Sequence, residues 1–189
     1  GDQAKLFEVI EREMENVERF VSALLSYTRS QNLHPDRVDL SRIAAEVVHD
    51  LRLSGRICGE VAVEGSEVEA WADADQIRQA VRNLAMNAVD AAGPEGRVTL
   101  RTGAEAPGRC WIEIEDDGPG IPAELRNRVF QPFYTTKPGG TGLGLAIVAR
   151  IVEEHDGKLQ LLDSASGGAR FRLLLQQPAA EPLLTAAAA

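Results

Sequence analysis

Apolar residues near the start of the chain recur at alternating steps of three and four. They are Leu6, Ile10, Met14, Val17, Val21 and Leu24, and charged residues lie between them. This spacing predicts an amphipathic helix whose apolar stripe forms the seam of a coiled coil or helical hairpin. Phe7, Phe20 and Leu25 widen the stripe, which favours a helical bundle over a two-stranded zipper. A single surface helix that packs on its own domain is the alternative.

This helical pattern breaks at Pro35, and we expect a linker over residues 31–38. Asp39 then has the position of an N-cap residue and predicts a helix that continues to about Leu53. The chain therefore divides into a helix over residues 1–30, a linker over 31–38, a globular domain over 39–176 and a flexible tail over 177–189.

The middle of the chain alternates between strand and helix patterns. Short strands are expected at 61–63 and 68–71. Asp73, with Gln76 three residues later, resembles a capping box and predicts a helix over 73–92, which the segment GPEG ends. The segments RVTLRTG and CWIEIEDD then alternate as two strands, and the short connection between them favours antiparallel pairing.

The last part of the domain has one long helix between irregular and strand segments. Pro122 opens a short helix, residues 129–141 are irregular, and a helix is expected over 142–155 with Gly157 as its C-cap. The segments KLQLLD and ARFRLLL complete the sheet. This order predicts an α+β fold, an α/β sandwich whose mixed, mostly antiparallel sheet has helices on one face, rather than a doubly wound sheet.

Composition excludes several classes of protein. Of 189 residues, 44% are hydrophobic, which is enough for one core, and the formal net charge is −9. Proteins that bind nucleic acid or anionic membranes normally need a basic face, so we expect neither partner. No apolar run approaches the ~20 residues of a membrane span. Cys58 and Cys110 stand apart and are expected to be reduced, packed thiols of a cytoplasmic protein.

The helix over 73–92 carries an unusual row of amides beside its core face. The core face is Ile77, Val81, Leu84 and Ala88, and the neighbouring face is Gln76, Gln79, Asn83, Asn87 and Asp90. Asparagine is a poor helix former, so two of them at i and i+4 indicate a specific role. Neutral oxygens on one face can complete the shell of a Mg²⁺ ion that also binds phosphates. Hydrogen bonding at the edge of the core is the alternative.

Two glycine-rich segments are candidates for ligand binding. Asp116 ends a strand beside Gly118 and Gly120, and such a carboxylate can accept from an exocyclic amine, although a plain turn explains the pattern equally well. The segment GGTGLGLA, residues 139–146, precedes a helix but lacks the lysine of a Walker A loop and the spacing of a Rossmann fingerprint. We interpret it as a nest of free amides for a phosphate chain.

These segments together resemble the GHKL, or Bergerat-type, ATP-binding fold of sensor histidine kinases, heat-shock chaperone ATPases, MutL and gyrase. QAVRNLAMNAVDAA is similar to the N box, EDDGPGIP to the G1 box, RVFQPFYTTK to the F box and GTGLGLAIV to the G2 box, in the same order. SGGARF resembles the last glycine box, with Gly167 and Gly168. The F box favours the kinase branch, and FYTTKPGGTGLGL is most similar to the nitrogen-regulation type. Residues 1–30 resemble the second helix of a dimerisation and histidine-phosphotransfer hairpin.

The resemblance implies roles for individual residues. It makes Asn87 the Mg²⁺ ligand and Asn83 its partner, and it has Asp116 bind the adenine amine. Lys137 and Arg128 would meet the phosphates, and Phe130 and Phe133 would anchor a lid over the nucleotide. Further nucleotide contacts would come from Asp90, Gly118, Gly120, Ile121, Thr136, Gly140, Thr141, Gly142, Leu143, Gly144 and Leu145.

Two positions depart from the family pattern. Position 117 is Asp where Asn is usual, which adds negative charge near the pocket. No H box of the H-E-x-x-x-P kind is present, and His34 lies in the linker, so we expect the phosphoacceptor histidine on a helix outside this chain.

The expected function is therefore that of the ATP-binding catalytic domain of a two-component sensor histidine kinase. It would transfer the γ-phosphoryl group of Mg·ATP to a histidine, and a response-regulator receiver domain would be the next acceptor. We expect a cytoplasmic homodimer through residues 1–30, within a full-length protein that can be anchored in the membrane. The alternatives are a protein-serine kinase of the anti-sigma type, an ATPase switch and a non-catalytic ATP-binding dimerisation module. Asn83 stands where such ATPases usually carry a catalytic Glu.

Overall fold

The computed structural model describes residues 33–105, 108–137 and 140–179, together with seven residues of the N-terminal segment. These seven are Phe7, Ile10, Met14, Val17, Val21, Leu24 and Leu25, and all are helical. The rest of the predicted 1–30 helix, most of the predicted tail, Pro138 and Gly139 lie outside the described residues.

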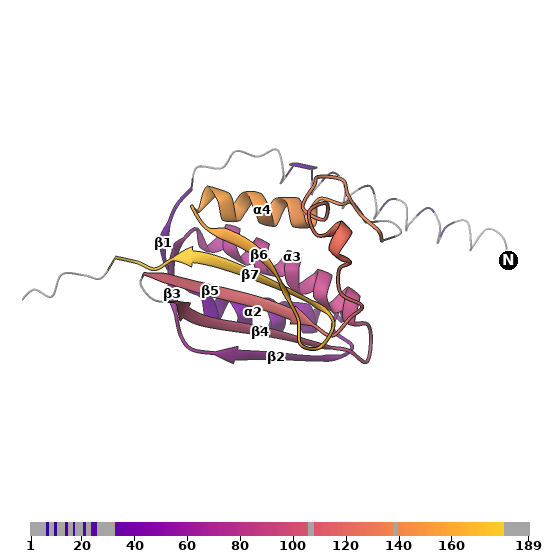
Figure 1. Ribbon diagram of the computed structural model, residues 1–189, viewed down its shortest axis with the longest axis horizontal. Helices are drawn as coiled ribbons and strands as arrows, with labels where there is room; N and C mark the ends of the chain where they lie inside the picture. Colours follow the sequence, from indigo (N-terminus) through magenta and orange to yellow (C-terminus); the bar gives the residue numbers. More distant parts are fainter. Residues whose placement is uncertain are drawn as a thin grey trace, which may run out of the picture.

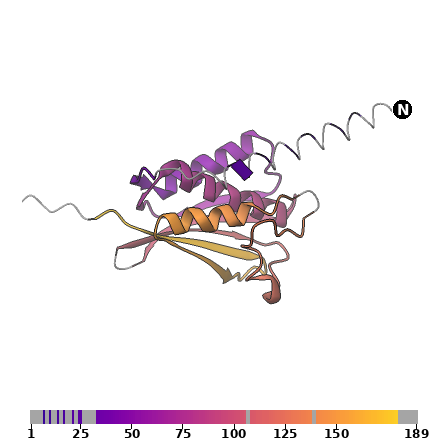
Figure 2. The same cartoon turned by 90° about the horizontal axis from the view of Figure 1, so that it is seen from above.

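A five-stranded sheet forms one layer of the domain, and helices cover one of its faces (Figure 1, Figure 2). The strand order is β2 (Glu60–Gly65), β4 (Arg97–Glu105), β5 (Arg109–Asp116), β7 (Ala169–Gln176) and β6 (Lys158–Asp163). Strands β2 and β4 are parallel, and the other neighbours are antiparallel. The covering helices are α2 (Leu40–Leu53), α3 (Ala74–Ala92) and α4 (Gly144–Glu154). The predicted mixed, mostly antiparallel sheet with helices on one face is confirmed.

A two-stranded antiparallel sheet lies at one end of the domain. It pairs β1 (Asp36–Asp39) with β3 (Glu69–Ala72). Residues 36–38, which we assigned to the linker, therefore form part of a strand of the domain. The sequence DRVD has no strand pattern of its own, and it is extended because β3 supplies a hydrogen-bonding edge.

The core lies between the sheet and the three helices. All four predicted core residues of α3 are buried, and so are Leu100, Ile112, Ile114 and Leu173 from the sheet. Burying a large apolar side chain stabilises a fold by about 1.5–3 kcal/mol, so this shared layer holds α3 and β5 at a constant separation.

Aspartates cap the first two long helices as predicted. Asp39 accepts hydrogen bonds from the amides of Ser41 and Arg42, and Asp73 accepts from those of Asp75 and Gln76. The reciprocal half of the predicted capping box is not formed, because the buried Gln76 Oε1 has no hydrogen-bond partner.

The short helix predicted after Pro122 is a 3₁₀ turn, η1 (Ala123–Leu125), and residues 129–137 are irregular as expected. Helix α4 begins at residue 144, two residues later than predicted.

The C-terminal end of α4 differs from its prediction. Asp156, with φ 50°, occupies the left-handed position, while Gly157 N donates to Val152 O and Asp156 N to Glu153 O. These two bonds define a Schellman motif whose left-handed residue is Asp156 rather than Gly157. Gly157 is required for close packing, since a Cβ there would lie 2.7 Å from Leu174 O.

His155, at the same helix end, joins α4 to α3. Its Nε2 accepts from Asp73 N at 2.9 Å, so Nδ1 carries the proton and donates to Ile151 O at 2.7 Å. This buried, neutral imidazole holds the end of α4 against the start of α3. The two helices that enclose the site described below are therefore fixed to each other.

The N-terminal segment exposes most of its described apolar residues. Phe7, Met14 and Val17 are 60–67% exposed, and Ile10, Val21 and Leu25 are exposed as well. Leu24 differs, because it is partly buried against the core of the domain. Most of the described side chains of the predicted seam are therefore not packed against the domain.

The two cysteines lie in different environments. Cys110 is buried, and burial raises the pKa of its thiol to about 11. Cys58 is exposed, so the prediction that both thiols are packed is wrong for this residue. Within the described part of the chain, no helix has the length and hydrophobicity needed to cross a bilayer.

Candidate functional site

A cleft of about 520 Å³ opens between α3, the N-terminal end of α4 and the irregular segment after β5. It gathers many of the predicted site residues, namely Asn87, Asp90, Asp116, Gly120, Ile121, Thr136, Lys137, Gly140, Thr141, Gly142, Gly144 and Leu145. A second hollow of about 460 Å³ beside Glu153 and Lys158 contains none of them. The first cleft is therefore the candidate site.

Asp116, the last residue of β5, lines this cleft. Its Oδ1 accepts from Gly118 N at 3.0 Å and from Ala169 N at 3.2 Å. Within the described residues Oδ2 accepts no hydrogen bond from the protein. One carboxylate oxygen thus orients the group, and the other remains for a ligand that donates a hydrogen bond.

The charge of Asp116 is disfavoured by its surroundings. Burial raises the pKa of its carboxyl above the ordinary value of 3.8, and the charges of Asp117 and Glu115 act in the same direction. The amides of Ala169 and Gly118 oppose this rise because they stabilise the anion. A positively polarised donor at Oδ2 would relieve the cost of the buried charge.

Asp117 points away from the cleft. Its Oδ1 accepts from Arg97 N at 2.8 Å, it is exposed, and it does not line the cleft. The extra charge that the sequence places near the pocket therefore acts on Asp116 and does not contact a ligand in the cleft.

The part of the cleft that the start of α4 lines is suited to an anion. Helix α4 has no side-chain N-cap, whereas α2 and α3 each have one, so the first amides of α4 remain available. Gly142 precedes the helix with φ 66°, and its Cα packs against the Phe133 peptide, where a Cβ would overlap. The glycines of this segment therefore bring bare backbone to the cleft, as predicted for a phosphate nest.

A lysine and an aspartate that line the cleft form an ion pair. Lys137 Nζ lies 3.0 Å from Asp90 Oδ2, and both side chains are about half exposed. Asn87 lines the cleft one helical turn before Asp90. Its neighbour Asn83 instead donates to Gly144 O at 3.4 Å and so links α3 to the start of α4.

Six predicted residues do not line the cleft; Asn83 is one, and the others are Gly118, Arg128, Phe130, Phe133 and Leu143. Phe130 packs edge-on against Phe171 at 6.2 Å, and Leu143 is fully buried. Arg128 lies over the Tyr134 ring at 4.7 Å, and Phe133 is 55% exposed with φ 67°. These side chains support the segment around the cleft instead of lining it.

Sequence reasoning missed an apolar wall. The missed lining residues are Ala88, Ala91, Pro119, Pro122, Leu125, Val129, Tyr134, Thr135, Ala169 and Phe171. Pro119 and Pro122 stand inside the motif EDDGPGIP and could have been found from it. Leu125 and Val129 carry no comparable signal, because an isolated apolar residue usually belongs to a core. The missed lining residues together form a mostly apolar surface that is suited to a flat ring.

The described side chains are compatible with a magnesium ion that takes most of its ligands from phosphates and water and few from the protein. Among the described residues there is no group of three His, Cys, Asp or Glu side chains that could hold a metal by itself. The Asn87 amide supplies one neutral oxygen at the cleft, and Mg²⁺ commonly binds through one or two protein groups plus phosphates and water.

Comparisons with known proteins agree with this geometry. The profile of the family described as "Histidine kinase-, DNA gyrase B-, and HSP90-like ATPase" matches residues 72–179. The sensor histidine kinase ZraS of Escherichia coli O157:H7 is 35% identical over 181 residues, which are 93% of this chain and 39% of that kinase. This chain thus spans well under half the length of that relative.

Two solved structures are similar to this chain over most of its length. Full-length ShkA in complex with AMPPNP superposes with a TM-score of 0.78 at 26% identity, covering 95% of this chain and 40% of ShkA. The histidine kinase ThkA in complex with the response regulator protein TrrA gives a TM-score of 0.77 at 25% identity, covering 92% of this chain and 51% of that one.

Proposed function

The chain belongs to the family of histidine kinase-, DNA gyrase B- and HSP90-like ATPases, and we propose that it is the ATP-binding catalytic domain of a two-component sensor histidine kinase. One observation carries the proposal. The same cleft is lined by a buried carboxylate with a free oxygen and by residues of an uncapped helix N-terminus. These two features suit the adenine amine and the phosphate chain of one nucleotide.

Each of these two features has a separate task in the proposed reaction. Asp116 Oδ2 accepts from the adenine amine, and the apolar wall packs against the ring. The first amides of α4 and the Lys137 ammonium bind the phosphates, for which Lys137 must leave Asp90. Asn87 is the residue that would hold Mg²⁺, and the ion would neutralise charge on the phosphate oxygens.

The proposed transfer requires a histidine from another polypeptide segment. The bond from the γ-phosphorus to its bridging oxygen breaks, a bond to an imidazole nitrogen forms, and ADP leaves. Positioning and charge neutralisation account for most catalysis of this kind. The complex of ThkA with TrrA supports a response-regulator receiver domain as the next acceptor. We place the domain in the cytoplasm, where receiver domains and ATP are available.

Labelling with radioactive ATP tests this proposal. The chain alone should remain unlabelled in Mg²⁺, because His34, His49 and His155 lie outside any H box. Addition of a separate phosphotransfer hairpin from a sensor kinase should give an acid-labile, base-stable label on that hairpin. Stoichiometric acid-labile label on the chain itself, lost in His34→Ala, would contradict the proposal.

GTP should bind more weakly than ATP, since the C6 carbonyl oxygen of guanine would face Asp116 Oδ2, which is also an acceptor.

Asn87→Ala should remove the contribution of Mg²⁺ to ATP binding. In the wild type we expect Mg²⁺ to tighten ATP binding, and in the variant this effect should disappear because the protein oxygen is gone. ADP binding without metal should change by less than about twofold, since it does not use that oxygen. Calorimetry with and without Mg²⁺ measures both quantities. Equal losses in the two conditions would count against a metal role for Asn87.

The exposed seam supports a homodimer through residues 1–30, with a second copy of this chain as the occupant. Deletion of residues 1–30 should therefore give a monomer that still binds ATP, because the domain core does not depend on the seam except at Leu24. The double substitution Met14→Glu and Val21→Glu in the full chain should have the same effect. Sedimentation velocity measures both. A wild-type chain that is already monomeric at high micromolar concentration would contradict the dimer.

A further inference from the structure

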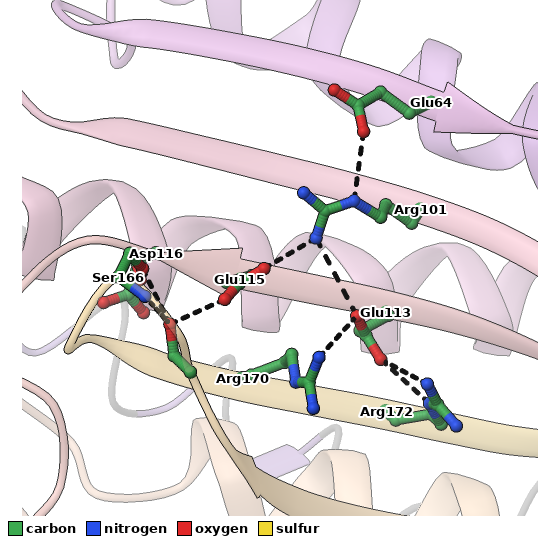
Figure 3. Close-up of polar contacts among 9 residues, drawn as sticks. Glu64, Arg101, Glu113, Glu115, Asp116, Ser166, Arg170 and Arg172 are labelled. Carbon is green, nitrogen blue, oxygen red and sulfur yellow. Dashed lines mark hydrogen bonds and ion pairs between the residues drawn. The ribbon is translucent and has the colours of Figure 1, made fainter.

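A network of ion pairs covers the helix-free face of the sheet (Figure 3). Arg101 from β4 pairs with Glu115 at 2.6 Å, and Arg172 from β7 pairs with Glu113 at 2.8 Å. Glu113 is only 3% exposed although no second layer of described residues covers this face, because Arg101, Arg170 and Arg172 surround its carboxylate. The network fixes the side chains of β5 up to Glu115, the residue directly before Asp116.

The turn between β6 and β7 is attached to this network by Ser164. Ser164 Oγ donates to Glu115 Oε1 at 2.6 Å. Burial acts to raise the pKa of Glu115, but the hydrogen bonds from Ser164 and Arg101 outweigh it and hold that pKa below its ordinary value. Glu115 is therefore an anion that can only accept, and the single hydroxyl proton of Ser164 belongs to this bond.

Ser166, two residues later, attaches the same turn to Asp116. Its Oγ donates to the Asp116 carbonyl oxygen at 3.0 Å, and the Ser164 oxygen, 2.7 Å away, shares that proton. Ser166 N in turn donates to Ser164 Oγ at 3.1 Å. The two serines thus form one continuous contact from the Glu115 side chain to the Asp116 backbone. Figure 3 shows Ser166 beside Asp116.

The far end of this turn reaches the other face of the strand. Successive side chains alternate across a sheet, so Glu115 lies on the open face and Asp116 on the helix-covered face. Gly168 packs so closely on Asp116 that an added Cβ would overlap its carbonyl oxygen, and Ala169 N donates to Asp116 Oδ1 at 3.2 Å. The turn therefore holds the end of β5 from both sides.

We propose that Ser166 is a positioning residue for base recognition: by binding the Asp116 carbonyl it keeps the β6–β7 turn against the strand end, so that Ala169 N holds Oδ1 and Oδ2 faces the base. This inference rests on the proposed function, in which Asp116 accepts from the adenine amine. Ser166 does not line the cleft, so it acts on the ligand only through Asp116.

Three substitutions test this role against three ligands. Ser166→Ala removes the bond to Asp116, Ser166→Thr keeps the hydroxyl at an exposed position, and Ser164→Ala is the matched control. In the control the bond to Glu115 and the bond from Ser166 N are lost, whereas the Ser166 hydroxyl remains and its proton is wholly available to Asp116. The ligands are ATP, ITP, which has a carbonyl oxygen in place of the C6 amine, and inorganic tripolyphosphate, which has no base.

We expect Ser166→Ala to weaken ATP binding about fivefold and to lower the ratio of ATP to ITP affinity by a similar factor. Tripolyphosphate binding should be unchanged, since the proposed phosphate-binding residues are not part of this turn. Ser166→Thr should restore the wild-type ratio, and Ser164→Ala should leave it within about twofold. Competition against a fluorescent nucleotide measures all twelve affinities, and thermal unfolding reports whether the variants remain folded.

The outcomes separate this inference from the function on which it rests. A wild-type chain that binds no ATP would overturn the proposed function and the inference with it. A wild type that prefers ATP, with a Ser166→Ala variant that keeps the same ratio, would overturn the inference alone. Equal losses for all three ligands, or an equal change in Ser164→Ala, would show a general effect of the turn and overturn the positioning role.

Discussion

Asp116→Asn is expected to weaken ATP binding by roughly 5- to 150-fold while the empty protein becomes more stable at neutral pH. The asparagine Oδ1 can still accept from Gly118 N and Ala169 N, so its amide nitrogen must take the place of Asp116 Oδ2. Two donors would then face each other at the adenine amine. A buried polar group left without its partner costs about 1–3 kcal/mol, which corresponds to the stated range.

The expected gain in stability follows from the pKa of Asp116. Burial raises this pKa in the folded state above the ordinary value of 3.8, so the folded protein binds the proton more tightly than the unfolded chain. The contribution of Asp116 to stability is therefore complete below pH 3.8 and is lost as the pH rises through the folded-state pKa. Asparagine cannot ionise, so its advantage should be present at pH 7 and should shrink as the pH falls toward 4.

Calorimetry with ATP and thermal unfolding between pH 4 and 7 measure these two effects. Asp117→Asn is the matched control, because Asp117 is the neighbouring carboxylate but points to Arg97 N and lies outside the cleft. It should leave ATP affinity within a few-fold of the wild type. An Asp116→Asn protein that binds ATP normally would refute the assignment of Oδ2 to the base. One that is less stable than the wild type at pH 7 would contradict the raised pKa of Asp116.

Gly142→Ala is expected to reduce ATP affinity at least tenfold. Gly142 has φ 66°, which costs an L-residue about 1–2 kcal/mol, and an added Cβ would overlap the Phe133 carbonyl carbon. Such overlaps cost typically about 1–3 kcal/mol more. The strain should be relieved by displacement of residues 133–142, which carry the cleft-lining Thr136 and Lys137.

Gly55→Ala separates backbone strain from overlap. Gly55 has nearly the same φ, 67°, but nothing lies within 4 Å of its added Cβ, and it is remote from the cleft. We expect Gly55→Ala to lower stability by about 1 kcal/mol and to leave ATP affinity unchanged. Hydrogen exchange over residues 129–142 should increase in Gly142→Ala and not in Gly55→Ala. Equal ATP affinities in the two variants would remove the argument for close packing at Gly142.

Part of the candidate site could be predicted because its residues lie close together in the sequence. Asn87 and Asp90 share a helix face because of the helical period alone. The glycines at the start of α4 likewise predict exposed backbone amides at a helix N-terminus. The apolar wall could not be predicted. Leu125, Val129 and Phe171 come from separate segments, and nothing local distinguishes a cleft residue from a core residue.

The two local predictions that the structure corrects, at residues 36–38 and at the C-terminal end of α4, both fail because of long-range contacts. Residues 36–38 are extended because β3 pairs with them, although their own sequence has no strand pattern. Asp156 takes the left-handed position because Gly157 must lie directly against Leu174 on another element. In both places a neighbour distant in the chain outweighs a local preference of about 1 kcal/mol or less.

The sequence by itself determined the order of helices and strands, the caps at Asp39 and Asp73, and the motifs that identify the family. Periodicity, capping and turn chemistry depend on residues within a few positions of one another, so the chain encodes them locally. The tertiary structure decided which oxygen of Asp116 is free, where Asp117 points and which turn holds the strand end. These properties depend on Arg97 and Ala169, which the folded sheet brings to Asp117 and Asp116 and whose partners the linear chain does not specify.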